Sequence, residues 1–228
     1  MKRSIMVLMV LAISCYGLFA GGGQQGGTAG GSAAGGSTAK VFDMKIGHVL
    51  AVENPRQVSL VWFKDEVEKK TNGGIKVTIY PAGQLGTEKE MLEQVSSGVI
   101  QGFRGGQTDF LPKMIIFSLP FLYDTSEQAL KLVNSDFAKK ITEDSKKTGT
   151  VILGIGDAGG FRNFTNSKHP ITKPADFAGL KIRTNGLDTV DRTLKAFGAS
   201  TVSIPFNDLY MALKTGVADG QENPWVQI

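Results

Sequence analysis

Apolar and polar residues alternate just beyond residue 40, and the apolar spacing then switches between strand and helix periods. Phe42, Met44 and Ile46 have polar neighbours, which predicts a first strand. Asn54 and Pro55 are typical of a helix start. The apolar positions expected along this helix, which would end near residues 72–73, are Val58, Val61, Trp62 and Val67.

The next segments continue the alternation. Residues 75–80 predict a second strand, and residues 81–83 its exit turn. Thr87 and Glu90 have the spacing of a capping box, which predicts a helix that closes at Gly98. A short strand near 99–103, an apolar run over 114–122, a helix over 126–147 and a strand over 151–155 should follow. This β-α-β-α order favours helices on both faces of a mainly parallel sheet.

The pattern restarts after Gly159 and Gly160. Strands are expected over 161–164, 180–183 and 201–204, with a helix over 187–197 ending at Gly198. Asn207 is expected to cap a last helix over 208–215. A second sheet-and-helix unit after a Gly-rich crossover predicts two lobes, and ligand sites favour such interfaces and the carboxyl ends of strands.

The amino-terminal segment resembles a secretory signal. Lys2 and Arg3 precede an apolar run over 5–13 that is too short to span a bilayer, and Ala20 is a plausible cleavage point. Lipidation at Cys15, the only cysteine in the sequence, is the alternative. Either route predicts a periplasmic protein. Residues 21–40 are rich in Gly, Ser, Thr and Ala, which predicts a flexible linker.

Charge and motifs exclude several classes of function. The formal net charge is +4, and no Lys/Arg cluster is interleaved with aromatic residues, so no nucleic-acid partner is expected. His48 and His169 are isolated, so we expect no metal and no cofactor. The Gly105-Gly106 and Gly159-Gly160 pairs lack the spacing of phosphate-binding loops and favour turns or hinges.

In the last third of the chain, two polar residues lie at the ends of apolar segments. Arg183 ends the run that begins at Leu180, and Asn223 ends the segment that begins at Gly216. A guanidinium matches a carboxylate in two parallel charge-assisted hydrogen bonds, and an amide both donates and accepts. Together they predict a cleft for a small organic acid.

The ordered fragments across most of the chain carry a family resemblance. They are Ile46-Gly47-His48, Ile79 to Gly86, Phe117 to Phe121, Pro174 to Arg183, and Asp219 to Pro224. In this order and spacing the chain resembles the periplasmic solute-binding component of tripartite ATP-independent periplasmic (TRAP) transporters, the dicarboxylate-binding (DctP) family. The resemblance implies two α/β lobes, 41–159 and 160–228, that close on an organic acid and deliver it to a membrane permease.

The resemblance also implies roles for individual residues. Arg183 matches the principal carboxylate-binding arginine and Arg162 the second cleft arginine. Phe206 matches an aromatic that packs on the ligand, Asn223 the amide that hydrogen-bonds it, and Trp225 lies close enough to form a pocket wall. Gln107 is a further candidate for substrate contact. It ends the segment Phe103-Arg104-Gly105-Gly106-Gln107, where some relatives place an acidic or hydroxyl residue, and Arg104 could add a third positive group suited to a dicarboxylate.

Each candidate has a structural alternative. Arg183 could pair with an acid such as Asp176, Arg162 could bridge the lobes, and Asn223 could satisfy backbone groups at a turn before Pro224. Phe206 and Trp225 could belong to the core. His48 could line the cleft mouth or be a hydrogen-bonded histidine at a strand end.

The expected molecule is a monomeric transport subunit and not an enzyme. Members of the resembled family are usually longer, so we expect the second lobe to be incomplete. A ligand-sensing subunit is an alternative, because its cleft would look identical. A hydrolase or lyase acting on organic acids is less favoured, because the chain has no Gly-x-Ser-x-Gly elbow and no metal cluster.

Overall fold

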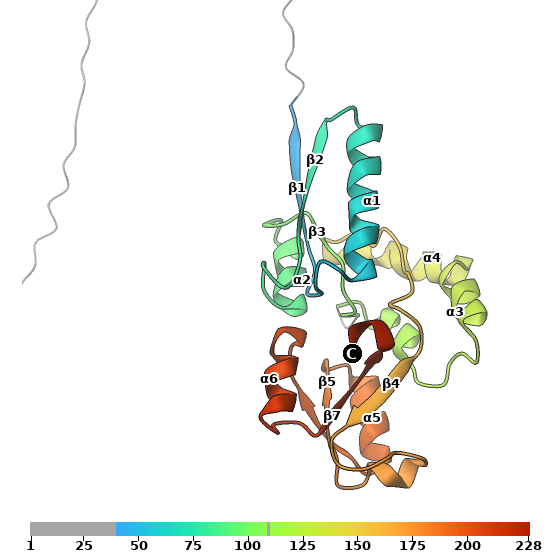
Figure 1. The fold of residues 1–228 in the computed structure, drawn as a ribbon. Coiled ribbons are helices and arrows are strands. Elements are labelled where there is room, and N and C mark those ends of the chain that lie inside the picture. The colour runs from blue at the N-terminus through green and yellow to red at the C-terminus, as the bar shows by residue number, and fades with distance from the viewer. Residues whose placement is uncertain (1–39, 109) are drawn as a thin grey trace, which may run out of the picture. The chain divides into compact units, whose positions relative to one another are not determined.

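The first sheet has three parallel strands in the order β2-β1-β3. The structure is a computed structural model that describes residues 40–108 and 110–228. The predicted signal peptide, Cys15 and nearly all of the predicted linker lie outside the described residues. The strands are β1 (Phe42–Gly47), β2 (Ile75–Tyr80) and the two-residue β3 (Gly102–Phe103), as predicted. Figure 1 shows the helix α1 (Pro55–Lys70) alongside β1 and β2.

Helices pack on this sheet through two apolar clusters. Leu60 of α1 packs with Ile46 of β1 and Val77 of β2. The helix α2 (Glu88–Ser96) contributes Met91 to a second cluster, and Gly47 is close enough to its sulfur that a side chain there would collide. Both predicted helix starts are confirmed: the Asn54 side chain caps α1, and Thr87 and Glu90 form the capping box of α2.

Part of the apolar pattern of α1 is not buried. Val67 packs against the cluster of Ile46 and Leu60, as an inward position should. Val58, Val61 and Trp62 are exposed among the residues that the structure describes.

Three predictions between residues 126 and 215 are wrong in detail. The helix expected over 126–147 is broken into α3 (Ser126–Val133), α4 (Asp136–Glu143) and a 3-10 turn over Asp144–Thr148. The break occurs because the Ser135 hydroxyl accepts from the Ala138 amide and starts a new helix. Residues 151–155 form no strand, and their recorded backbone bond goes to a side chain: Ile152 N–H donates to Ser145 Oγ at 3.0 Å.

The Asn207 cap is the third error. A 3-10 turn over Phe206–Asp208 precedes the helix α6 (Leu209–Lys214), whose first turn has Asp208 before it and no side-chain cap. Asn207 instead lies against Gly83, where an added side chain would collide with its amide. The Asn207 side chain, which local spacing assigned to the helix, therefore makes a tertiary contact instead.

The second sheet has four strands in the order β4-β7-β5-β6. Its strands are β4 (Arg162–Asn166), β5 (Lys181–Thr184), β6 (Ser200–Ser203) and β7 (Gly220–Pro224). β5 is parallel to β6 and β7, whereas β4 is antiparallel to β7. The helix α5 (Asp188–Ala196) packs Leu194 against Ile182 and Phe177, and the turn after it uses Gly198 in a left-handed conformation. The two sheets with their helices confirm an α/β fold.

Candidate functional site

Arg183 lies in β5, between Ile182 and Thr184, and only 2% of its surface is exposed. Its backbone register pairs it with Val202 on one side and Gln221 on the other, so it belongs to an interior strand of the sheet. Its Nε donates to the carbonyl oxygen of Ile204 at 2.8 Å. The guanidinium is therefore oriented by the backbone at the end of β6.

Among the residues that the structure describes, Arg183 has no carboxylate partner. Among residues 40–108 and 110–228 the side chain makes one recorded hydrogen bond and no ion pair. Burial lowers the pKa of Arg183 to about 10, while the negative charges of Glu222 and Glu88 oppose this effect and the positive charge of Arg162 adds to it. A buried cation without a close counter-ion is costly, and an incoming anion would remove that cost.

The alternative partner for Arg183 is occupied elsewhere. The Asp176 carboxylate accepts from the Thr172 amide at 2.8 Å, the Thr172 hydroxyl at 2.8 Å and the Lys173 amide at 3.0 Å. These bonds lower the pKa of Asp176. An Arg183–Asp176 pair is therefore not formed.

Arg162 forms hydrogen bonds to residues of the neighbouring strand β7. Its Nε and Nη2 both donate to the Glu222 carboxylate, and Nη2 also donates to the carbonyl of Glu222 at 2.8 Å and to Asn223 Oδ1 at 2.8 Å. Its side chain is 40% exposed and that of Glu222 only 3%. Arg162 thus neutralises the buried acid of β7 in this structure.

The polar run of β7 is almost completely buried. Gln221, Glu222 and Asn223 are each 2–3% exposed. Asn223 donates through Nδ2 to Gln221 Oε1 and accepts from Arg162, so its amide is bonded to side chains rather than to the backbone of a turn. Arg183 and Gln221 share a register position, which places the candidate amide and the candidate cation on neighbouring strands.

The two aromatic candidates differ in burial. Phe206 is partly buried and packs against the cluster of Val49, Leu50 and Met91 from the first half of the chain. Trp225 follows β7 and is 67% exposed. Phe206 is thus placed to contact both halves of the described chain, while Trp225 buries little of its ring there.

A second polar cluster gathers beyond the carboxyl ends of β1 and β3, which sequence reasoning largely missed. Glu88, the first residue of α2, accepts from Arg56 Nη1 at 3.2 Å and from the Gly106 amide at 3.1 Å. Arg104 Nη1 donates to the Arg56 carbonyl at 3.1 Å. The signal for Glu88 was present in the capping box, since Thr87 fixes it at a helix start.

His48 is the hydrogen-bonded strand-end histidine, not a solvent-facing one. It is fully buried; the Leu50 amide donates to its Nδ1 at 3.3 Å, so Nε2 carries the proton that bonds Gln57 Oε1 at 2.7 Å. Burial lowers its pKa, the bond to Gln57 raises it, and Arg56 and Arg104 lower it further. The remaining candidate, Gln107, is partly buried in the segment that follows Arg104.

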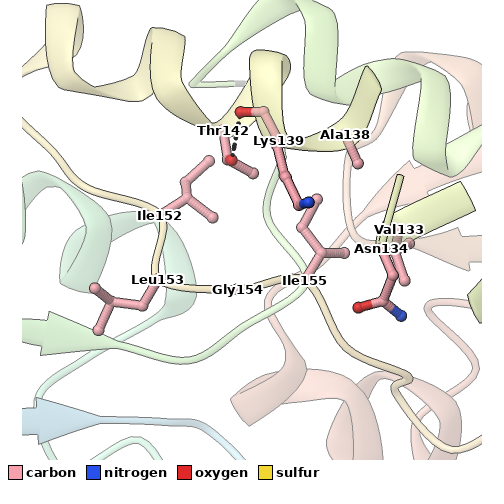
Figure 2. A pocket seen from close by; sticks show the side chains of 9 residues that line it. All are labelled: Val133, Asn134, Ala138, Lys139, Thr142, Ile152, Leu153, Gly154 and Ile155. Atoms are coloured by element: carbon pink, nitrogen blue, oxygen red, sulfur yellow. Dashed lines mark hydrogen bonds between the residues drawn. The ribbon is translucent and has the colours of Figure 1, made fainter. Parts of the chain in front are cut away.

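Two hollows in the described structure lie away from these residues. One lies between α4, the end of α3 and residues 152–155, and its one basic side chain is Lys139 (Figure 2). Lys139 is paired with Asp136 at the surface, so this hollow offers no uncompensated charge. The other is an open depression beside α2, near Leu92 and Phe110. Neither is lined by a predicted site residue.

The fold has two sheets, each with its own helices, and this α/β architecture is that of solute-binding proteins. The family model described as bacterial extracellular solute-binding protein, family 7 (DctP), matches residues 46–228, and the chain belongs to this family. Membership implies a periplasmic location.

Individual relatives are consistent with this family membership. The chain is 32% identical to the C4-dicarboxylate-binding periplasmic protein DctP of Rhodobacter capsulatus over 79% of this chain and 55% of that protein. It is similar to a solved TRAP periplasmic solute-binding protein from Polaromonas sp. JS666 bound to D-erythronate, with 34% identity, a TM-score of 0.77, and coverage of 80% of this chain and 61% of that one. A protein of the same kind from Sulfurospirillum deleyianum with bound succinate gives 29% identity, a TM-score of 0.73, and coverage of 81% and 60%.

The chain spans about half the length of the curated relatives it matches. Within the described residues, no helix has the length and apolar character that a membrane crossing requires.

Proposed function

We propose that this chain belongs to the extracytoplasmic solute-binding subunit of a TRAP transporter and that it captures a small organic acid. The observation that carries the proposal is the buried guanidinium of Arg183, which has no carboxylate partner within the described part of the chain. A carboxylate that docks there forms charge-assisted hydrogen bonds to a donor whose water is already largely removed. The protein binds its solute and does not convert it.

The other candidates complete this proposed site. Phe206 supplies an apolar surface, and Gln107 and Trp225 are further contacts to the acid. Arg162 and Asn223 are already bonded to Glu222 and Gln221, so they act by fixing the polar strand beside Arg183. They contact the ligand only through groups that these bonds leave free.

Capture is a conformational equilibrium in this proposal. Residues 41–159 and 160–228 form two lobes that close on the acid, and the ligand shifts the equilibrium only by its differential affinity for the closed state. The closed form, a monomer, delivers the acid to the membrane permease. Residues 1–20 direct export, with lipidation at Cys15 as the alternative route to the same compartment, and 21–40 are the linker.

A thermal-shift screen tests this proposal. The whole chain is heated with mono-, di- and keto-acids and with the neutral amide of each acid as the matched control. A bound ligand raises the unfolding midpoint by mass action, so at least one acid should raise it and its amide should not. Equal shifts with acids and amides, or no shift with any acid, would contradict an anion-binding function.

A further inference from the structure

The 3-10 turn Phe206–Asp208, which separates β6 from α6, contacts the first half of the chain with two adjacent side chains. Phe206 packs against the apolar cluster that contains Met91 of α2. Asn207 lies against Gly83, where an added Cβ would be 2.9 Å from Asn207 Cγ and 3.0 Å from its Oδ1. This β6–α6 turn therefore connects the two proposed lobes through one apolar and one polar side chain.

Gly83 belongs to a turn that is held in place by the first sheet. Its backbone is left-handed, with φ +70°, and its amide donates to the carbonyl of His48 at 3.0 Å. Leu85, in the same turn, packs on the cluster that receives Phe206. Because Gly83 has no side chain, the fixed turn leaves the space that the Asn207 amide occupies.

The β6–α6 turn also continues directly from the backbone that orients Arg183. The carbonyl of Ile204 accepts from Arg183 Nε at 2.8 Å, and Phe206 follows two positions later. The Asp208 amide donates to the Pro205 carbonyl at 3.1 Å, which keeps the intervening residues in a tight turn. A displacement of the turn away from the first sheet therefore acts on the segment that orients the guanidinium.

Two other contacts between the proposed lobes are single hydrogen bonds. The hydroxyls of Ser118 and Thr189 are 2.9 Å apart, and Asn54 Nδ2 donates to the Val226 carbonyl at 2.9 Å. The β6–α6 turn differs from them because it also buries apolar surface. Phe206 is only partly buried, and hydrophobic stabilisation scales with the area removed from water, so this contact is weak enough to open and form again.

We propose that the β6–α6 turn is the closing contact of the two lobes, and that it sets how much of the free protein is closed. The inference rests on the proposed function. Gly83 is not among the proposed ligand contacts, so a change there alters affinity for an acid only through the lobes. Apparent affinity falls in proportion to the fraction of molecules in the binding-competent state.

The first test measures a distance between the lobes without ligand. Nitroxide labels at Lys69→Cys in α1 and Lys195→Cys in α5, both exposed positions, report this distance by pulsed electron–electron double resonance. The background is Cys15→Ser, because Cys15 is the only cysteine in the sequence. Gly83→Ala places a methyl group where the Asn207 amide lies, so the population with the longer distance should increase.

Three further variants separate a wedge from a strained backbone. Gly73 is also left-handed, with φ +76°, and an added Cβ there meets no other group within 4 Å, so Gly73→Ala should leave the distances unchanged. The double variant Gly83→Ala/Asn207→Ala removes the colliding amide and should restore most of the wild-type distribution. Phe206→Ala removes the apolar part of the contact and should also lengthen the distance. This variant carries the test if Gly83→Ala does not fold.

The second test is calorimetric titration with succinate, lactate and pyruvate, and with any other acid that gives a thermal shift. An acid that binds the wild-type chain should bind Gly83→Ala about 5- to 30-fold more weakly, the range that overpacking of a contact costs. Gly73→Ala should bind the same acid as tightly as wild type.

The outcomes distinguish this inference from the proposed function. Unchanged distances in Gly83→Ala and Phe206→Ala, unchanged affinity in Gly83→Ala, or a lengthening that Gly73→Ala reproduces would overturn the closing contact and leave anion capture standing. A longer distance in Gly83→Ala, together with a wild-type chain that binds no acid of the screen, would overturn anion capture and leave the closing contact standing.

Discussion

Strands β4 and β5 each present one candidate arginine, and the two guanidinium groups are in opposite situations. The side chain of Arg162 is 40% exposed and donates four recorded hydrogen bonds to Glu222 and Asn223. Arg183 is 2% exposed and donates one, to a backbone carbonyl. The more deeply buried cation therefore has the weaker set of partners.

Folding stability alone favours the reverse arrangement. A charge removed from water needs a counter-ion, and the need grows with burial. Arg162 of β4 and Glu222 of β7 meet this requirement, and fold stability alone explains their pairing. Arg183 does not meet it, and a buried titratable group that the fold leaves uncompensated is a candidate for function.

The largest expected effect on stability is at Arg162. Arg162→Ala leaves the Glu222 carboxylate buried and unpaired, so unfolding free energy should fall by about 3–5 kcal/mol. Urea denaturation followed by circular dichroism measures the change. Adding Glu222→Gln to that variant should restore part of the loss, since the double variant buries no charge. Equal stability of the single and double variants would show that Glu222 finds another partner.

Replacing Arg183 should raise the free energy of unfolding, whereas replacing Arg162 lowers it. Arg183→Met removes a buried cation while nearly keeping its length, so unfolding free energy should rise by about 1–2 kcal/mol despite the lost bond to Ile204. The same denaturation experiment without ligand measures it, with Arg192→Met as the exposed control. A loss comparable to that of Arg162→Ala would mean that Arg183 is a structural residue after all.

The smallest expected effect is at the surface. Lys113 and Lys147 donate to Asp144 and lower its pKa to about 2. The folded-state pKa of Asp144 lies below its usual value of 3.8, so the pairs stabilise the fold above that value and lose this effect as the pH falls toward about 2. Asp144→Asn should therefore lower the unfolding midpoint slightly at pH 6 and not at pH 2. A difference that persists unchanged at pH 2 would assign the effect to packing, with Asp136→Asn as the control.

Much of the fold could be predicted because its signals are local. The alternation around Met44 and the capping residues Asn54 and Thr87 act within one strand or one helical turn, and the structure confirms them. The left-handed glycines after α2 and α5, Gly98 and Gly198, end those helices for the same local reason.

Two of the failures lie where a distant partner decides, and the third is local. Residues 151–155 have the composition of a strand but pair with no neighbouring strand among the described residues. Asn207 has the spacing of a cap but lies against Gly83. The spacing of residues 126–147 did not distinguish one helix from two, because the Ser135 hydroxyl competes locally with continuation of the helix.

The candidate site divides in the same way. The position of Arg183 at the end of an apolar run was enough to place it in a strand, but the interior place of that strand follows only from its pairing with β6 and β7. The partner of Arg162 could not be predicted, because it depends on the antiparallel register that aligns Arg162 with Pro224 beside Glu222. Arg56, the paired arginine of the second polar cluster, was missed for the same reason, since its acid lies on another helix.

The most direct test is calorimetric titration of Arg183→Met with the acid that gives the largest thermal shift. Loss of that carboxylate contact should weaken binding by about 3 kcal/mol or more, while the unliganded variant stays folded and at least as stable as wild type. Unchanged affinity in this folded variant would show that the buried guanidinium of β5 does not receive the acid.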